Sequence, residues 1–264
     1  MSNHKILTID NLSLQEFDSE AELIPLLTPE DEEEMNNELL PDSLPILPLR
    51  NMVLFPGVVI PITAGRDKSI KLINDANASG KNIGVVAQKN EEDEDPTKDD
   101  IHTVGTVARI LRVLKMPDGN ITIILQGKKR FEIAEVVSEE PYITATVKEV
   151  PEKRPKKNDT EFNAIIDSLK ELAVKIIQES PNLPSEATFA IKNIESKSFL
   201  VNFVSSNMNL SVKEKQDLLK INDLKDRALE TLRFMNVELQ KLKIKNDIQS
   251  KVRFDLDQQQ REYF

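Results

Sequence analysis

The chain has 264 residues, of which 39% are apolar and 30% are charged, and it contains no cysteine. This composition gives ample material for a hydrated surface and a sizeable core, and it excludes disulfides and thiolate metal sites. No apolar run approaches the ~20 residues that a membrane-spanning helix needs, so we expect a cytoplasmic protein with no membrane partner.

The net charge of −10 is concentrated at the amino terminus. Residues 1–42 hold twelve acidic groups and one basic group, Lys5, which leaves 33 acidic and 34 basic groups in residues 43–264. Like charges at this density repel one another and oppose compaction. We therefore expect residues 1–42 to form an acidic, disordered tail, in which a docking role for residues 23–27 stays open.

Residues 43–62 combine several prolines with mostly apolar side chains. Proline fixes φ and has no backbone donor, so neither a helix nor a regular central strand can run through this segment. The apolar side chains nevertheless require burial. The pattern predicts extended pieces of the edge or bulged kind, at residues 46–49, 52–55 and 58–62, with a Pro56-Gly57 turn.

The rest of the chain up to about residue 150 is predicted to be mostly β. One helix is expected at residues 67–78, ended by Gly80, and residues 116–120 form a hairpin turn. The charged residues 91–100 are expected to be a solvated loop. β-branched, largely alternating segments predict strands at residues 83–88, 104–114, 121–126, 131–137 and 142–150. Together these elements predict a closed or partly closed barrel over residues 43–150.

Residues 151–159, rich in proline and charge, are predicted to be a hinge, and every element after them is helical. Apolar residues at helical spacing predict a helical lobe over residues 160–222. Within it, Ser211 and Glu214 form a capping box that opens a helix. Residues 223–264 contain no proline or glycine, which predicts one helix of roughly 60 Å.

The long helix carries an apolar stripe that we expect to mediate self-association. The stripe first follows 4-3 heptad spacing and resumes after a phase slip. Its members are Leu232, Met235, Leu239, Leu242, Ile248, Val252 and Leu256. The helical pattern runs to the last residue without a cap, so we expect the chain to be truncated within this helix.

No catalytic, metal or nucleotide site is expected. None of the seven glycines has the Gly-x4-Gly-Lys-Ser/Thr spacing with which a P-loop holds phosphate. The two histidines, His4 and His102, lie in the acidic tail and beside the acidic loop, where we expect neither to bind a metal. The carboxylate pairs lie in mobile acidic runs that would not hold catalytic geometry.

Lys128, Lys129 and Arg130 form a basic turn, followed by the aromatic Phe131. A basic patch with an aromatic neighbour can bind RNA, so an RNA-binding barrel is one alternative. We favour a solvated hairpin turn with Phe131 in the core, because residues 43–264 are near neutral and offer few aromatics for base stacking. Nucleic acid is therefore not an expected partner.

Several of these segments together resemble the amino-terminal domain of the Lon protease family. The matching motifs are P-L-R-x-x-V-x-F-P-G at residues 48–57, G-R-x-x-S-I at 65–70, G-T-x-A at 105–108, G-x-x-R-F at 127–131 and Q-R-E-Y-F at 260–264. The resemblance implies an α+β fold with a small, mostly antiparallel, PUA-like barrel, a helical lobe and a long projecting carboxy-terminal helix.

The resemblance also implies a role. The chain would be the substrate-recognition region of a bacterial ATP-dependent Lon protease, truncated before the P-loop ATPase and the Ser/Lys protease, so it would not catalyse and would bind no ATP or Mg²⁺. The expected partners are unfolded or damaged polypeptides and further copies of the chain, hexameric in the family and weaker or dimeric here.

Met52, Leu54 and Phe55 are our predicted substrate contacts, because the neighbouring prolines prevent this edge from being fully paired. The alternative is that all three belong to the core. A structural role also stays open, in which the long helix assembles protomers and the barrel is a spacer.

Overall fold

The computed structural model describes residues 6–7, 24–25, 27–180, 183 and 186–262. The chain divides into two compact units. The barrel unit contains residues 27–156 and 195–227. The helical unit contains residues 157–194 and 228–262, together with the described parts of residues 1–26.

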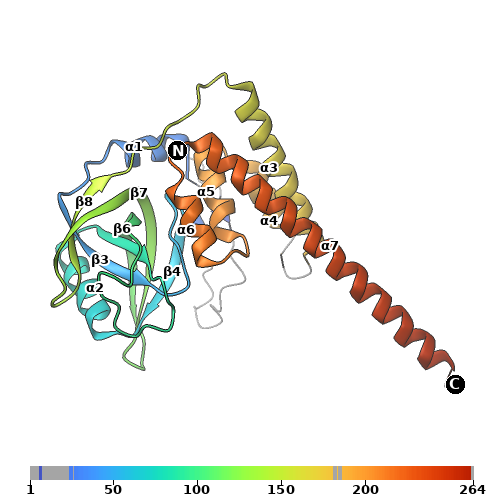
Figure 1. Cartoon of the computed structure of the whole chain (residues 1–264), viewed down its shortest axis with the longest axis horizontal. Helices are drawn as coiled ribbons and strands as arrows, with labels where there is room; N and C mark the ends of the chain where they lie inside the picture. The colour runs from blue at the N-terminus through green and yellow to red at the C-terminus, as the bar shows by residue number, and fades with distance from the viewer. Residues whose placement is uncertain (1–5, 8–23, 26, 181–182, 184–185, 263–264) are drawn as a thin grey trace. The chain divides into compact units, whose positions relative to one another are not determined.

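Six strands of the barrel unit form a nearly closed, mixed sheet (Figure 1). In chain order they are β3 (Ser43–Leu49), β4 (Val59–Ala64), β5 (Ile83–Ala87), β6 (Val104–Lys115), β7 (Ile121–Ser138) and β8 (Thr144–Glu149). Their order in the sheet is β4-β7-β6-β5-β3-β8, and β8 also pairs with β7, which closes a ring of five strands. Only β3 and β5 pair in parallel, so the predicted, mostly antiparallel barrel is confirmed.

The long strand β7 corrects one prediction. We expected two strands separated by a turn at residues 127–131, whereas β7 runs without a break through 18 residues. Gly127 is required for another reason, because a Cβ there would lie 2.3 Å from the carbonyl oxygen of Phe55. The Gly57 amide donates to the Gly127 carbonyl at 2.9 Å, so this glycine lets the turn after Phe55 pack directly on the strand.

The prolines of residues 43–62 can lie in strands because the strands that contain them are only partly paired. β3 pairs with β8 at its start and with β5 from Ile46 onward. β4 ends the strand order and pairs with β7 alone among the described strands. The expected extended piece at residues 52–55 joins no strand, although the Leu54 carbonyl accepts a hydrogen bond from the buried Thr106 hydroxyl at 2.6 Å.

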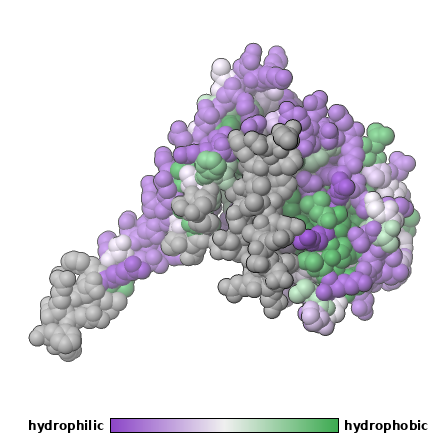
Figure 2. Space-filling model, turned by 180° about the vertical axis from the view of Figure 1, so that it is seen from behind, coloured by the Kyte–Doolittle hydropathy of each residue, from purple (hydrophilic) through white to green (hydrophobic). Residues whose placement is uncertain are grey.

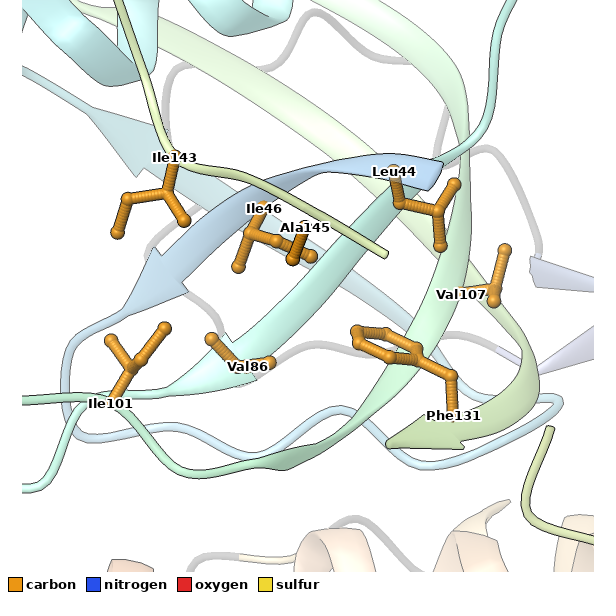
Figure 3. Packing of buried hydrophobic residues seen from close by; sticks show 8 residues of the cluster. All are labelled: Leu44, Ile46, Val86, Ile101, Val107, Phe131, Ile143 and Ala145. Atoms are coloured by element: carbon orange, nitrogen blue, oxygen red, sulfur yellow. The ribbon is translucent and has the colours of Figure 1, made fainter. Parts of the chain in front are cut away.

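The core of the barrel unit is a cluster of apolar side chains inside the ring (Figure 3). Phe131 lies in the middle of β7 and is fully buried. At Gly105 of the neighbouring β6, a Cβ would lie 3.0 Å from the Phe131 ring and 2.3 Å from the Val85 carbonyl oxygen. The cluster consists of Leu44, Ile46, Val86, Ile101, Val107, Phe131, Ile143 and Ala145.

The predicted helix after β4 is confirmed as α2 (Asp67–Ser79), which ends at Gly80 in the left-handed conformation with φ of 64°. The predicted turn at residues 116–120 is also confirmed. Gly119 there has φ of 89°, and the Met116 amide donates to the Asn120 carbonyl at 2.9 Å. Both glycines supply the positive φ that their turns require.

Helix α1 (Pro29–Asn37) lies within the stretch that we expected to be disordered. Thr28 and Asp31 form a capping box, and Pro29 begins the helix. Acidic side chains in the first turn interact favourably with the helix dipole, so the charge that argued against folding here stabilises a helix start.

The remaining helices are shared between the units. α3 (Thr160–Glu179) and α4 (Glu186–Asn193) belong to the helical unit, whereas α5 (Lys197–Asn207) and α6 (Val212–Lys220) belong to the barrel unit. α6 opens with the expected capping box. α7 (Leu224–Glu262) begins in the barrel unit and continues in the helical unit. Among the described residues, no helix is both long and apolar enough to cross a membrane.

Contacts within the barrel unit explain why α5 and α6 join the barrel. The buried Gln216 of α6 donates to the Val104 carbonyl at 2.7 Å, and Asn202 of α5 donates to the Pro56 carbonyl at 3.1 Å. These long-range hydrogen bonds satisfy backbone groups of the barrel, which no pattern in residues 160–222 indicated.

We predict that Phe131→Ala lowers the free energy of unfolding by about 3–5 kcal/mol, because it leaves a cavity at the centre of the ring. Val137→Ala is the control, since Val137 lies on the same strand and is 62% exposed. Its effect should stay within about 0.5 kcal/mol. Urea unfolding followed by circular dichroism measures both; similar effects would contradict the assignment of Phe131 to the core.

Candidate functional site

A groove on the barrel unit runs between the end of β3 and strand β4, with a volume of about 360 Å³. We call it the proline groove, because Pro48 and Pro61 lie on its two sides. Its lining consists of residues 47–50, 52, 61–66 and 69. In the view of Figure 2, hydrophobic residues gather on one face of the barrel unit among hydrophilic ones, so this unit also has hydrophobic residues on its surface.

One wall of the proline groove is an edge strand. β4 pairs through residues 59–64 with β7, and it has no second partner among the described strands. Pro61 removes one backbone donor from this edge, which discourages pairing with another sheet. An extended peptide can still lie along such a strand and place its side chains in the groove.

Arg66 and the buried Gln88 organise one end of the groove. The Arg66 guanidinium donates to the Gln88 side-chain oxygen at 2.8 Å and to the Asp93 carbonyl at 3.0 Å. Gln88 donates to the same carbonyl at 2.6 Å, so the charged loop at residues 91–100 is anchored there. Burial, and then the positive charge of Arg50, lower the pKa of Arg66.

The three predicted substrate contacts lie in different surroundings. Met52 is half-buried and lines the proline groove, whereas Leu54 and Phe55 are buried, with exposures of 2% and 0%. A direct substrate contact by Leu54 or Phe55 would require them to leave the interior. The role of all three as substrate contacts stays a prediction. Arg50 and Arg66 belong to the motifs of the family resemblance, but the sequence did not assign either of them to a site.

The basic segment at residues 128–130 is engaged within the barrel unit instead of forming a solvated turn. Lys128 is buried and pairs with Glu38, and Lys129 pairs with Glu149 at 3.2 Å. Arg130 is only 3% exposed. None of the three cations is therefore displayed as an open patch for phosphate.

Arg130 holds the carboxy-terminal end of α6. Its guanidinium donates to the Leu219 and Ile221 carbonyls, each at 2.9 Å. Burial, with a smaller contribution from the charge of Arg227, lowers the pKa of Arg130 to about 10, so it remains protonated at neutral pH. Arg227 is itself fully buried and pairs with Glu152. The second residue of the expected hinge, Glu152, is therefore fixed by an ion pair.

The predicted stripe of the long helix divides into two parts. Met235 and Leu239 are buried, and Leu232 and Leu242 are half-buried. Ile248 and Val252 are exposed, with fractions of 56% and 51%. The side chain of Leu256 lies outside the described residues.

No metal centre emerges from the described part of the chain, where no three His, Asp or Glu side chains are grouped to hold an ion. His102 is half-buried, and burial followed by the charges of Lys220 and Lys89 lowers its pKa. His4 lies outside the described residues.

Residues 43–237 match the family described as the ATP-dependent protease La (LON) substrate-binding domain. The chain is 86% identical over all 264 residues to a Lon protease of Flavobacterium johnsoniae, and covers 32% of that protein. It is 50% identical over 244 residues, or 92% of its length, to a Lon protease of Cytophaga hutchinsonii, of which it covers 30%. The chain thus spans about a third of the length of these relatives.

Two solved structures share the fold. The N-terminal domain of a Mycobacterium avium complex Lon protease aligns with a TM-score of 0.59 and 22% identity, covering 74% of this chain and 98% of that one. A Lon N-terminal domain protein from Xanthomonas campestris aligns with a TM-score of 0.51 and 18% identity, covering 72% and 97%. The α+β fold expected from the sequence is therefore confirmed.

We predict that Arg130→Gln destabilises the protein by about 2–4 kcal/mol, because the Leu219 and Ile221 carbonyls lose a buried, charged donor. Lys129→Gln is the matched control on the same strand. It breaks an ion pair with the exposed Glu149, which is worth at most about 1 kcal/mol. Urea unfolding compares the two; equal losses would show that Arg130 is not the anchor inferred here.

Proposed function

Since the chain belongs to the family of Lon protease substrate-binding domains, we propose that it binds unfolded or damaged polypeptides for degradation by a Lon protease. The observation that carries this proposal is the proline groove, where Met52 and apolar residues of β3 lie beside the edge strand β4. Folded proteins bury the side chains that such a groove accepts, whereas unfolded chains expose them.

The groove suits an extended peptide better than a compact ligand. Its apolar lining comes from strands and from the proline-bearing segments next to them. Burial of one large apolar side chain of the peptide contributes about 1.5–3 kcal/mol. A few such contacts, offset by the cost of ordering the peptide, support affinities in the micromolar range without requiring one sequence.

We assign no catalytic step to this chain. In this proposal, the ATPase and the Ser/Lys protease belong to a part of a Lon protease outside these 264 residues. In this proposal ATP and Mg²⁺ belong to that other part, and the protein acts in the cytoplasm.

We predict that Met52→Gln weakens binding of an unfolded polypeptide about tenfold, because it places an amide in the apolar groove. Fluorescence anisotropy with a labelled, reduced and alkylated protein measures the affinity, and the same protein in its folded form is the negative control.

Val137→Gln is the matched variant for this experiment, since Val137 is an exposed apolar residue of the barrel unit outside the groove. Its affinity should equal that of the unaltered chain. An equal loss for both variants, or no loss for Met52→Gln, would place the binding surface elsewhere.

A second proposed role is self-association through the far part of α7. Ile244, Ile248 and Val252 are spaced four residues apart and are each more than half exposed. Residues four apart share one face of a helix, so these three form an apolar strip. A second copy of this helix presents the same strip and would cover it.

We predict that the double variant Ile248→Glu, Val252→Glu abolishes concentration-dependent association, because like charges would face each other across the interface. Sedimentation equilibrium measures the molecular mass. Lys245→Gln with Lys251→Gln is the control on the same helix, because it changes the net charge by the same two units and leaves the strip unaltered. If both double variants dissociate alike, overall charge and not the strip governs association.

A further inference from the structure

We propose that the proline groove binds an extended segment of an unfolded polypeptide as an additional β-strand, paired through its backbone with the edge of β4 that faces away from β7. The segment would donate hydrogen bonds to the carbonyls of Pro61 and Thr63 and accept one from the Thr63 amide. This inference rests on the proposed function. It adds the chemical feature by which the groove recognises a substrate, which is an unpaired backbone.

The lining of the groove indicates that it meets two strands at their edges. Successive side chains of a strand point to opposite faces of the sheet, so a groove over one face is lined by alternate residues. The proline groove is lined instead by consecutive residues, 61–64 of β4 and 47–49 of β3. It is therefore a groove between two strand edges and not a hollow on one face of the sheet.

A hydrogen bond at the start of β4 fixes which of its backbone groups face the groove. The Gly127 amide donates to the Val58 carbonyl at 2.9 Å, so this carbonyl points to β7. The amide and carbonyl of one residue in a strand point to the same side, and the side alternates along the chain. The register continues without a shift. Residues 60, 62 and 64 therefore point to β7, and residues 59, 61 and 63 point away from it.

Pro61 lies on the side of β4 that faces away from β7, so its missing N–H costs this sheet no hydrogen bond. Thr63 lies on the same side and offers both an amide and a carbonyl. Its hydroxyl is 3.0 Å from that of Thr122 on β7, a contact typical of a residue pair that shares no backbone hydrogen bonds. Thr63 is exposed and Pro61 is half-buried, so a ligand can reach this edge.

The opposite side of the groove has a similar arrangement. The Gln88 amide donates to the Leu49 carbonyl at 2.9 Å, and the Ile46 amide donates to the Ile143 carbonyl at 2.8 Å. Leu49 therefore points toward β5, and Ile46 points away from it. Pro48 alternates with Leu49 and also points away from β5, with a carbonyl but no donor. Prolines on both sides leave too few donors for β3 and β4 to pair directly, which accounts for the gap between them.

The polarity of these edges selects the occupant. Their carbonyls carry partial negative charge and require N–H donors, which folded proteins satisfy internally and unfolded chains leave unpaired. A second copy of this chain is a poorer occupant, because its β4 would bring another Pro61 without a donor. An unfolded segment supplies a donor opposite Pro61 in every register, unless that residue is itself a proline.

Thr63→Pro tests the backbone contact from the side of the protein. It removes the amide that faces the groove and leaves the amides that point to β7. We expect the affinity for a labelled, reduced and alkylated protein, measured by fluorescence anisotropy, to fall about tenfold, the effect of about one lost hydrogen bond. Thr63→Val is the matched control, because it removes the hydroxyl and keeps the amide. Its affinity should equal that of the unaltered chain.

A change in the ligand tests the same contact without altering the fold. The probe is a fluorescein-labelled peptide, Ser-Val-Leu-Val-Phe-Ser, prepared with amides throughout and with esters in place of two successive central amides. An ester has no N–H but keeps the length and the side chains, and two successive esters remove donors from both edges of the extended peptide. We expect the ester peptide to bind the unaltered chain about tenfold more weakly. If urea unfolding shows that Thr63→Pro does not fold, the ester peptide decides alone.

The outcomes distinguish this inference from the proposed function. If Met52→Gln weakens binding but Thr63→Pro and the ester peptide do not, side chains alone hold the substrate and the added strand is overturned. Equal losses for Thr63→Val and Thr63→Pro would assign the effect to the hydroxyl and also overturn it. A change in molecular mass for Thr63→Pro with unchanged peptide affinity would assign the edge to a second copy, with the same consequence. If no apolar peptide binds the unaltered chain, the proposed function fails before this question arises.

Discussion

The pairing of β7 with three other strands is the constraint on which the barrel unit depends. β7 is hydrogen-bonded to β4, β6 and β8, and the contact with β8 closes the ring. The same strand carries Phe131 into the centre of the core and Arg130 toward the carboxy-terminal end of α6. Since β4 pairs with β7 alone among the described strands, one wall of the proline groove is also held by this strand.

Buried polar contacts act together with the apolar core in holding the barrel unit together. Arg130, Arg227 and Glu152 connect the end of the barrel to the start of α7, and each lies among groups that would be costly to leave unpaired. On another part of the unit, Glu32 of α1 pairs with Arg154 and accepts a hydrogen bond from Ser196. Segments distant in sequence are thus joined by directional interactions and not by apolar contact alone.

The regular elements could be predicted from the sequence because their signals are local. The stop at Gly80, the turn at residues 116–120 and the capping box at Ser211 each depend on a few neighbouring residues. The prediction of a turn at residues 127–131 was wrong because a glycine followed by three cations has the composition of a solvated loop. Only tertiary structure supplies the carbonyls that Arg130 binds and the close approach of Phe55 that requires Gly127. For the same reason, Met52 could be predicted as a contact residue from its position beside prolines, whereas the arginines that line the groove could not.

The barrel unit is discontinuous in sequence, since residues 157–194 of the helical unit separate its two parts. During synthesis, the strands up to β8 leave the ribosome well before α5 and α6, whose side chains bind barrel carbonyls at Pro56 and Val104. Native contacts over such sequence separations form slowly, because the loop must close before they contribute. The nascent barrel therefore stays incomplete until about residue 227 has emerged, and the order of translation makes the assembly of this unit a late event.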